Sequence, residues 1–183
     1  MIPRAFCAVL LTAQAVMAAD YCGLSIGEIT ALPPSLAGDW QMTMRSGIGV
    51  VDGKAAAMPV DEAPDQASFT ADGIDLNLEK DDFFPTTLLR HFVIEDMFQP
   101  DLALPGESPL NAVELLDPEI KDSGLTCDPK TLPQFVGDVE MDGGASSTLR
   151  VYAFGADKMV LVIKGESGNQ AARAVFDLTR AAQ

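Results

Sequence analysis

From about residue 38 onward, apolar and polar side chains alternate along the chain in short runs. In residues 38–45, the apolar residues Trp40, Met42 and Met44 occupy every second position, with polar side chains between them. The same alternation, or a short continuous apolar run, returns at residues 74–79, 159–163 and 174–179. A period of two is typical of strands with one buried face. The pattern therefore predicts a mainly β protein.

Glycine-containing turn signals separate these apolar runs. They are the Asp-Gly pairs at residues 52–53 and 72–73 and the Asp-Gly-Gly run at 142–144. Such pairs favour tight hairpin turns between antiparallel strands. Short strands joined in this way predict an antiparallel up-and-down barrel or meander, with a sandwich as the alternative.

The middle of the chain follows a different pattern. Residues 88–97 carry apolar side chains at helical spacing, although their β-branched and aromatic residues would also suit a pair of strands. A helix start at Ser108 and Pro109 and a short helical turn within residues 128–135 are expected. We therefore expect a helical or irregular insertion at about residues 85–135, within a single β-rich domain that covers residues 19–183.

The first 18 residues have the layout of a secretory signal peptide. A single cation, Arg4, precedes an apolar run from Ala5 to Leu11, and small residues follow, so cleavage is expected after Ala18 or Ala19. That run is too short to span a bilayer, and no later segment is long and apolar enough. We therefore expect a periplasmic or secreted protein without a membrane span.

Two cysteines, Cys22 and Cys127, remain after the predicted cleavage. An even pair in an oxidising compartment predicts a disulfide, with two free thiols as the alternative. No C-x-x-C pair is present, so a redox role is not expected. The disulfide would tie the start of the mature chain to its middle.

The chain is strongly acidic, with a net charge of -15 at pH 7. Nucleic acids and anionic membranes are bound through basic patches, so neither is expected as a partner. Asp138, Glu140 and Asp142 are spaced like the first ligands of an EF-hand loop, but Leu149 stands where that loop needs a bidentate glutamate. A β-hairpin with Gly143 in its turn explains the same residues, so no metal site is predicted.

No residue pattern in the chain points to catalysis. His91 is the only histidine, so a nucleophile–histidine–acid triad would have to use it. No G-x-S-x-G nucleophile motif accompanies it. We therefore expect a protein that is not an enzyme and needs no cofactor.

The segment LAGDW at residues 36–40 contains Gly38 and Trp40, the only tryptophan, and the last predicted strand ends at Arg180. This combination resembles the G-x-W signature of the lipocalins and the wider calycin superfamily. The resemblance implies that Trp40 packs across the closed end of a barrel. It also implies that an arginine of the last strand, Arg180 or Arg173, covers the indole ring. Gly38 would permit close packing where the chain enters the barrel, and a guanidinium over an indole is a favourable cation–π pair.

The resemblance further implies a cup that binds a small apolar molecule. The inward positions would be Trp40, Met42, Met44, Leu76, Leu78, Val151, Val162 and Phe176. The alternative is that these side chains fill the core of a small barrel. We therefore expect an exported, non-catalytic, lipocalin-like binding protein for a small apolar ligand. The alternative function is an envelope protein–protein interaction or structural domain with a filled core, which would meet its partner through its acidic loops or the 85–135 insertion.

Overall fold

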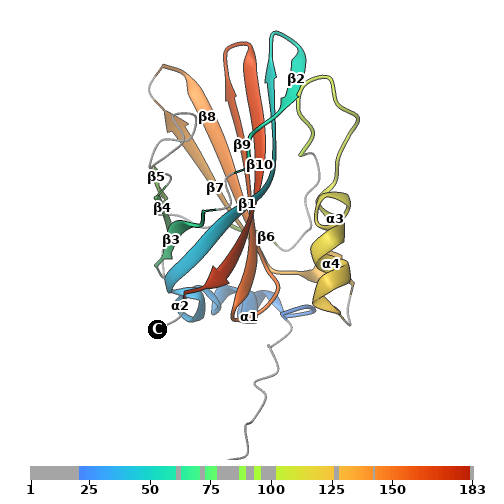
Figure 1. Ribbon diagram of the computed structural model, residues 1–183. Coiled ribbons are helices and arrows are strands. Elements are labelled where there is room, and N and C mark those ends of the chain that lie inside the picture. Colours follow the sequence, from blue (N-terminus) through green and yellow to red (C-terminus); the bar gives the residue numbers. More distant parts are fainter. Residues whose placement is uncertain are drawn as a thin grey trace, which may run out of the picture.

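The described strands form one sheet that curls on itself, with two short helices across one end and further helices against its outer side (Figure 1). This is a computed structural model of the chain. It describes residues 21–60, 63–70, 73–77, 87–89, 93–95, 102–125, 128–141 and 143–181.

Ten strands make up this sheet in the described part of the chain. They are β1 (Gly38–Val51), β2 (Lys54–Ala57), β3 (Asp65–Phe69), β4 (Ile74–Asn77), β5 (Thr87–Leu89), β6 (Val93–Glu95), β7 (Gln134–Met141), β8 (Ala145–Ala153), β9 (Lys158–Ser167) and β10 (Gln170–Arg180). Their order is β5-β4-β3-β1-β10-β9-β8-β7-β6, and β2 pairs with the second half of β1. Every pairing is antiparallel. The predicted mainly β, antiparallel meander is therefore confirmed.

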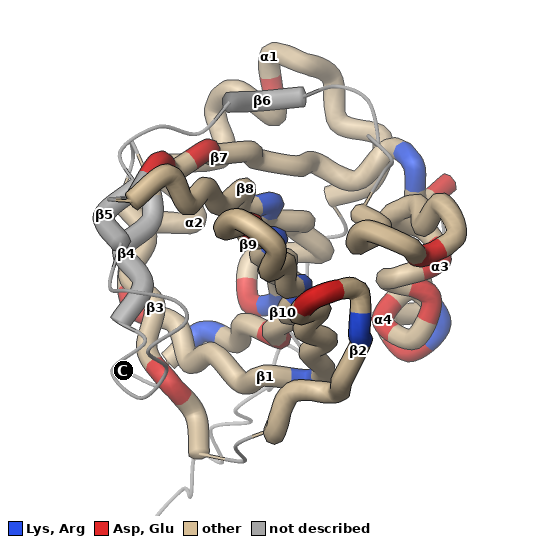
Figure 2. Tube along the Cα trace, turned by 90° about the horizontal axis from the view of Figure 1, so that it is seen from above, with Lys and Arg blue, Asp and Glu red and all other residues tan. Residues whose placement is uncertain are grey.

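The sheet curls strongly but does not close into a barrel. Its two edges are β5 and β6, and no pairing among the described residues joins them. These edge strands are nevertheless close in sequence, because Leu89 of β5 and Val93 of β6 are four Cα steps apart. Four steps reach at most about 14 Å. β5 also lies against β7, and Figure 2 shows the strands curving round from β3 through β1 to β7. The sheet is therefore open between β5 and β6, which lie in the middle of the sequence. The first and last long strands, β1 and β10, pair with each other.

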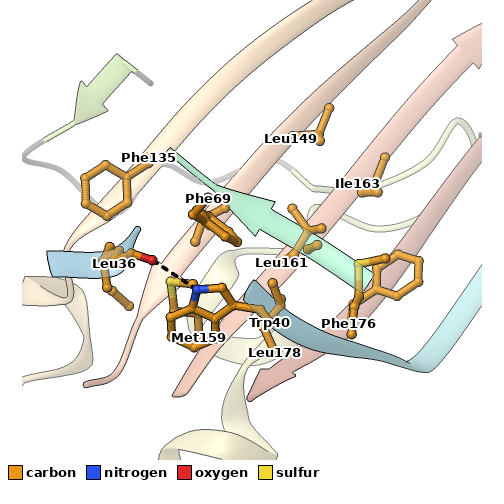
Figure 3. Close-up of a cluster of buried hydrophobic side chains, with 14 of the residues drawn as sticks. Leu36, Trp40, Phe69, Phe135, Leu149, Met159, Leu161, Ile163, Phe176 and Leu178 are labelled. Atoms are coloured by element: carbon orange, nitrogen blue, oxygen red, sulfur yellow. Dashed lines mark hydrogen bonds between the residues drawn. The ribbon is translucent and has the colours of Figure 1, made fainter. Parts of the chain in front are cut away.

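One face of the sheet, here called the inner face, carries the larger apolar cluster (Figure 3). Trp40 and Met42 of β1, Leu161 of β9, and Phe176 and Leu178 of β10 are all buried there. Alternate residues of a strand point to the same face, so the period of two read from the sequence brings these side chains together.

Two N-terminal helices lie at the end of the sheet where Trp40 is placed (Figure 1). They are α1 (Ile26–Thr30) and α2 (Pro33–Leu36). Ile29 and Leu36 are buried in the inner cluster. These helices were not predicted from the sequence, although the Ser25–Glu28 capping box that starts α1 is a recognisable signal.

The predicted helical insertion packs against the opposite face of the sheet, here called the outer face. It contains α3 (Ala112–Leu115) and α4 (Asp117–Ser123), and a 3-10 turn follows at Pro129–Thr131, as expected for residues 128–135. The helix start predicted at Ser108 and Pro109 is wrong, because α3 begins at Ala112 and Asn111 caps it by accepting a hydrogen bond from the Glu114 N–H at 2.9 Å. Leu102 and Leu116 of this segment pack with Tyr152, Val160 and Val175 of the sheet. The helix considered for residues 88–97 is wrong, because β5 and β6 occupy part of that range, and the alternative of two strands holds.

Candidate functional site

Trp40 closes the helical end of the inner face. Its indole Nε1 donates a hydrogen bond to the carbonyl oxygen of Leu36 at 3.0 Å (Figure 3). Its ring meets Phe69 edge-on, with 5.8 Å between the ring centroids. The guanidinium carbon of Arg180 lies 4.5 Å from the centroid of the indole ring. Trp40 and Arg180 are direct partners in the β1–β10 pairing, so the register itself places the cation beside the ring.

Arg180 also ties three parts of the chain together. Its guanidinium donates hydrogen bonds to the carbonyl oxygens of Ser35 and Ala37, both at 2.8 Å, and of Ala156 at 3.3 Å. Gly38 makes room for this arrangement. Its φ is 126°, and a Cβ at this position would lie 3.1 Å from the Arg180 Nη1. The structure thus brings together Gly38, Trp40 and Arg180, the residues expected at the closed end.

Next to Trp40, two rows of inner-facing side chains are tightly packed. Paired residues of neighbouring strands point to the same face, so the register arranges inner-facing residues in rows. The first row is Met42, Leu178, Met159 and Ala153, and the second is Met44, Phe176, Leu161, Val151 and Phe135. All of them except Met44 are buried. These rows form a filled core, so a ligand on the inner face would have to bind nearer the hairpins.

The rows nearer the hairpins carry smaller side chains. The third row is Gly47, Ala174, Ile163, Leu149 and Gly137, and the fourth is Gly49, Ala172, Gly165, Ser147 and Val139. A Cβ on Gly49 would meet no atom within 4 Å, so the inner face is open beside Gly49. Val51, the next inner-facing residue of β1, is 48% exposed. The apolar surface therefore continues from the packed core to the rim of the sheet.

Met58 lies at the boundary between the packed and the open part of the inner face. Its backbone N–H donates to the carbonyl oxygen of Gly47 at 2.9 Å. A Cβ on Gly47 would lie 2.9 Å from the Met58 Cβ and 3.0 Å from its sulfur. Met58 therefore fills the space that a side chain at position 47 would occupy. It is half-buried and packs against the inner cluster.

Most of the residues expected to line the interior are part of the packed core. Trp40, Met42, Val151 and Phe176 are buried on the inner face, and Met44 is half-buried against it. Leu78 and the side chain of Leu76 lie outside the described part of the structure.

The interior position predicted for Val162 is wrong. Its neighbours Leu161 and Ile163 take the inner face, so Val162 packs under the insertion in the outer cluster. Strand β9 is buried on both faces, and its continuous apolar run gave no sign of which residues point inward.

Sequence reasoning missed Gly47, Gly49, Met58 and Ser147, the residues around the open part of the inner face. Gly47 and Gly49 stand at alternate positions inside β1. Glycine inside a strand often marks the close approach of another group. That signal was present in the sequence, whereas nothing local connects Met58 with Gly47.

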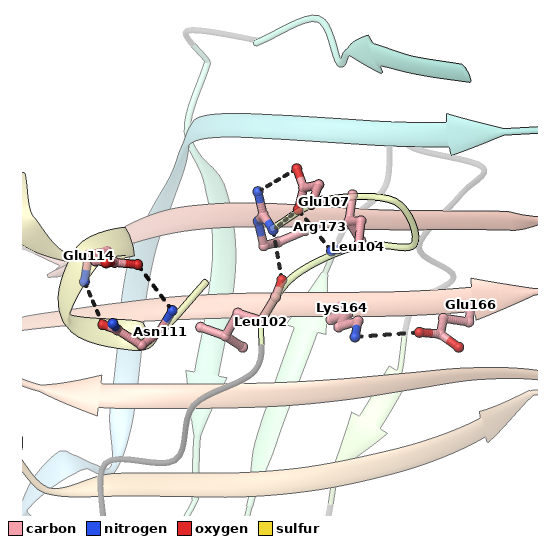
Figure 4. A network of polar contacts seen from close by, with 8 residues as sticks. All are labelled: Leu102, Leu104, Glu107, Asn111, Glu114, Lys164, Glu166 and Arg173. Carbon is pink, nitrogen blue, oxygen red and sulfur yellow. Dashed lines mark hydrogen bonds and ion pairs between the residues drawn. The ribbon is translucent and has the colours of Figure 1, made fainter. Parts of the chain in front are cut away.

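Arg173, the second arginine considered for the Trp40 ring, lies on the outer face instead. Its guanidinium is buried and donates to the Leu102 carbonyl oxygen at 2.7 Å and to the two Glu107 carboxylate oxygens at 2.7 and 3.3 Å (Figure 4). The hydrogen bonds from Arg173 hold the pKa of Glu107 below its ordinary value, although partial burial of the carboxylate opposes them. Arg173 therefore anchors the insertion to β10.

A second arginine anchors α4 to the outer face. Arg45 forms an ion pair with Glu119, whose side chain is 7% exposed, and its Nη1 lies 3.7 Å from a carboxylate oxygen of Asp177. Burial lowers the pKa of Arg45, and the charge of Asp177 acts in the opposite direction. Both ion pairs hold the insertion in place, and both lie on the face opposite to Gly49.

The other residues named from the sequence form no site in the described structure. Asp138 and Glu140 are exposed on β7 of a hairpin, Asp138 accepts a hydrogen bond from Thr148 at 2.6 Å, and Asp142 is not described. No cluster of three acidic, histidine or cysteine residues suited to a metal ion occurs within the described ranges. His91 also lies outside them.

Cys22 is the only cysteine among the described residues, and it is disulfide-bonded. It packs against the outer cluster, as does Leu125. Cys127 is not described, so its pairing with Cys22 stays a prediction.

Within the described residues, no helix has the length and apolar character needed to cross a membrane. No protein-family model, curated protein or solved structure matches the chain.

Proposed function

We propose that this chain is an exported, non-catalytic binding protein that holds a small apolar ligand on the inner face of its curled sheet, at the hairpin end. The observation that carries the proposal is the open space beside Gly49, on a face whose other inner-facing residues are mostly buried from Trp40 to Ala172. A concave apolar surface that its own side chains fill only in part is a common setting for small apolar ligands. The lipocalin-like arrangement of Gly38, Trp40 and Arg180 supports the same function.

The side chains around the open part favour binding over catalysis. In the described structure, the inner-facing positions of β8, β9 and the hairpin halves of β1 and β10 carry no titratable group. Ser147 is the one hydroxyl in the row that contains Gly49. A serine hydroxyl becomes an effective nucleophile only beside a general base. The same surface is well suited to apolar contact, which needs no charged partner.

The substitution Gly49→Val tests the proposal directly. Because a Cβ at this position meets no atom within 4 Å, valine should fit without displacing the core and should fill the open side. The matched control is Ser46→Val, which adds a branched apolar side chain to an exposed position of the same strand. Binding of the uncharged fluorescent probe N-phenylnaphthylamine would be measured for each variant. The oxidised mature chain, purified from its exporting cells, would also be studied by native mass spectrometry. Extraction of the same sample with organic solvent would release any bound apolar molecule.

We expect the unmodified chain and Ser46→Val to bind the probe, and a co-purifying apolar molecule to appear in the extract. Gly49→Val should bind the probe at least about ten-fold more weakly while its thermal stability is unchanged or higher. The ligand-binding function would be refuted if the native mass equals that of the protein without a bound molecule and the unmodified chain also fails to bind the probe.

A second function, docking of an envelope protein, is favoured by the edge of strand β2. In the described part of the sheet β2 pairs only with β1, and all four of its residues are exposed. Val51 and Val60, which flank this hairpin, are exposed apolar residues. A free edge beside apolar side chains can accept a strand from a partner. The apolar side of residues 102–125 is less suited to this role, because it is already packed on the outer face. Cross-linking from a photoreactive residue at position 56 in exporting cells would capture such a partner.

A further inference from the structure

We infer, on the basis of the proposed function, that Met58 is the specificity-determining residue of the inner face and sets the length of the apolar ligand. The side chain would act as a flexible floor between the packed core and the open side. A ligand that extends beyond the open side would have to displace Met58.

The contact between Met58 and Gly47 places this floor. The Met58 N–H is held by the Gly47 carbonyl oxygen at 2.9 Å, one position beyond the Ile48–Ala57 pair of the β1–β2 ladder. The backbone of Met58 is thus fixed in register with the sheet, while its side chain has three rotatable bonds. Unbranched, polarisable methionine side chains adapt readily to irregular apolar surfaces.

Gly47 and Gly49 occupy successive inner-facing positions of β1, but their surroundings differ. The space at Gly47 is taken by the Cβ, Cγ and sulfur atoms of Met58, whereas the space at Gly49 is open. Met58 is only half-buried, so its side chain is not locked on all sides by the core. The boundary of the ligand space is therefore a single side chain of low rigidity.

Ser147 adds a polar group to the same part of the inner face. It lies in the same row as Gly49, the residue is 7% exposed, and its hydroxyl makes no hydrogen bond with any described residue. The hydroxyl oxygen is not fully enclosed by protein, so a polar group of a ligand can reach it. A ligand with one hydroxyl or carbonyl group would satisfy Ser147 while its apolar chain reaches Met58. The expected ligand class is therefore a linear or near-linear amphiphile with one such polar group.

The test measures how affinity depends on ligand length in Met58→Ala. Primary alkanols from octanol to hexadecanol would displace N-phenylnaphthylamine from the oxidised mature chain. Each additional buried methylene should strengthen binding by about four-fold until the chain reaches the floor. The control is Ile48→Ala, which removes a comparable side chain from the adjacent residue on the outer face. Gly47→Ala is a second variant, because its added methyl group would lie 2.9 Å from the Met58 Cβ and so must displace Met58.

In the unmodified chain and in Ile48→Ala, affinity should stop rising at the same alkanol. In Met58→Ala this limit should move to an alkanol longer by at least about two carbons, since three side-chain heavy atoms have been removed. In Gly47→Ala the limit should move to a shorter alkanol. Ser147→Ala should weaken every alkanol by a similar factor of about five without moving the limit.

An unchanged limit in both Met58→Ala and Gly47→Ala would overturn the role of Met58 and leave the proposed function intact. Failure of the unmodified chain to bind the probe or any alkanol would instead overturn the proposed function itself. A shift of the limit in Ile48→Ala equal to that in Met58→Ala would also overturn the inference, because general loosening of the sheet would then explain it.

Discussion

Replacing Arg180 with alanine tests whether the closed end of the sheet is held by the arginine that covers Trp40. The substitution removes the guanidinium 4.5 Å from the indole centroid and the hydrogen bonds to the carbonyl oxygens of Ser35, Ala37 and Ala156. These contacts join the entry to β1, the end of β10 and the turn between β8 and β9. Their loss should loosen the end of the sheet without changing the rest of the core.

The magnitude follows from the two kinds of contact. A partly exposed cation–π pair contributes about 1 kcal/mol. The two hydrogen bonds at 2.8 Å have a charged donor, but water can reach the Ser35 carbonyl, so together they contribute about 2 kcal/mol. Arg180→Ala should therefore lower the free energy of unfolding by about 3 kcal/mol. Arg180→Lys keeps a cation near the ring but cannot make the forked hydrogen bonds, so it should cost about half as much.

The assay can use the protein's own fluorophore. Trp40 is the only tryptophan and its side chain is 1% exposed, so its emission reports directly on this end of the sheet. Urea unfolding would be followed by this emission and by circular dichroism. We expect the emission of folded Arg180→Ala to move to longer wavelength because water gains access to the ring.

Two results would refute this reasoning. One is a change below about 0.5 kcal/mol in Arg180→Ala with the emission of Trp40 unaltered, which is the range of ordinary surface substitutions. The other is a double-mutant cycle with Trp40→Leu, followed by circular dichroism, that shows no coupling. The cation–π contact predicts a coupling energy of about 1 kcal/mol between these neighbours.

Three further predictions concern the outer-face ion pairs and the entry to β1. The pKa of Glu107 is lowered in the folded chain, mainly by hydrogen bonds from Arg173, so its contribution to stability is present at neutral pH and is lost as the pH falls through its folded-state pKa. Urea unfolding at about pH 6 and about pH 3 should therefore show a smaller loss of stability in Glu107→Gln than in the unmodified chain, and equal losses would contradict the ion pair. Arg45→Ala should lower the free energy of unfolding by about 3 kcal/mol because it leaves the buried Glu119 carboxylate without its cation, and adding Glu119→Leu should restore most of it. Gly38→Ala should lower the free energy of unfolding by about 2 kcal/mol, since alanine is strained at a φ of 126° and its methyl group would crowd Arg180. A change near zero in the same denaturation assay would contradict close packing between Gly38 and Arg180.

Local patterns in the sequence were sufficient to predict most of the long strands and their antiparallel arrangement. The alternation at residues 38–45 and 174–179 and the glycine turn signals are properties of neighbouring residues, so they can be read without knowledge of the fold. The contact of Trp40 with an arginine of the last strand was also predicted, because the resemblance to the G-x-W signature implies it, with Arg180 or Arg173 as the arginine. The helix expected at residues 88–97 failed because the same apolar residues suit a helix and a strand, and only strand partners decide between them.

The candidate site depended on tertiary structure to a greater degree. Val162 belongs to an apolar run that is buried on both sides, so its orientation was set only when the insertion covered one face of β9. Trp40, Met42 and Phe176 were expected around a ligand, yet the curl of the sheet packs them against one another. The open side beside Gly49 and the contact of Met58 with Gly47 lie in rows that cross several strands.

The sequence by itself therefore determined most of the long strands, the turns between them and the place of the tryptophan near the start of the first long strand. Only the tertiary structure decided which face is inner, how far the core fills it and where space remains. The physical reason is that strand propensity and turn geometry act over a few residues, whereas burial and open space depend on residues far apart in sequence that the curl of the sheet brings together.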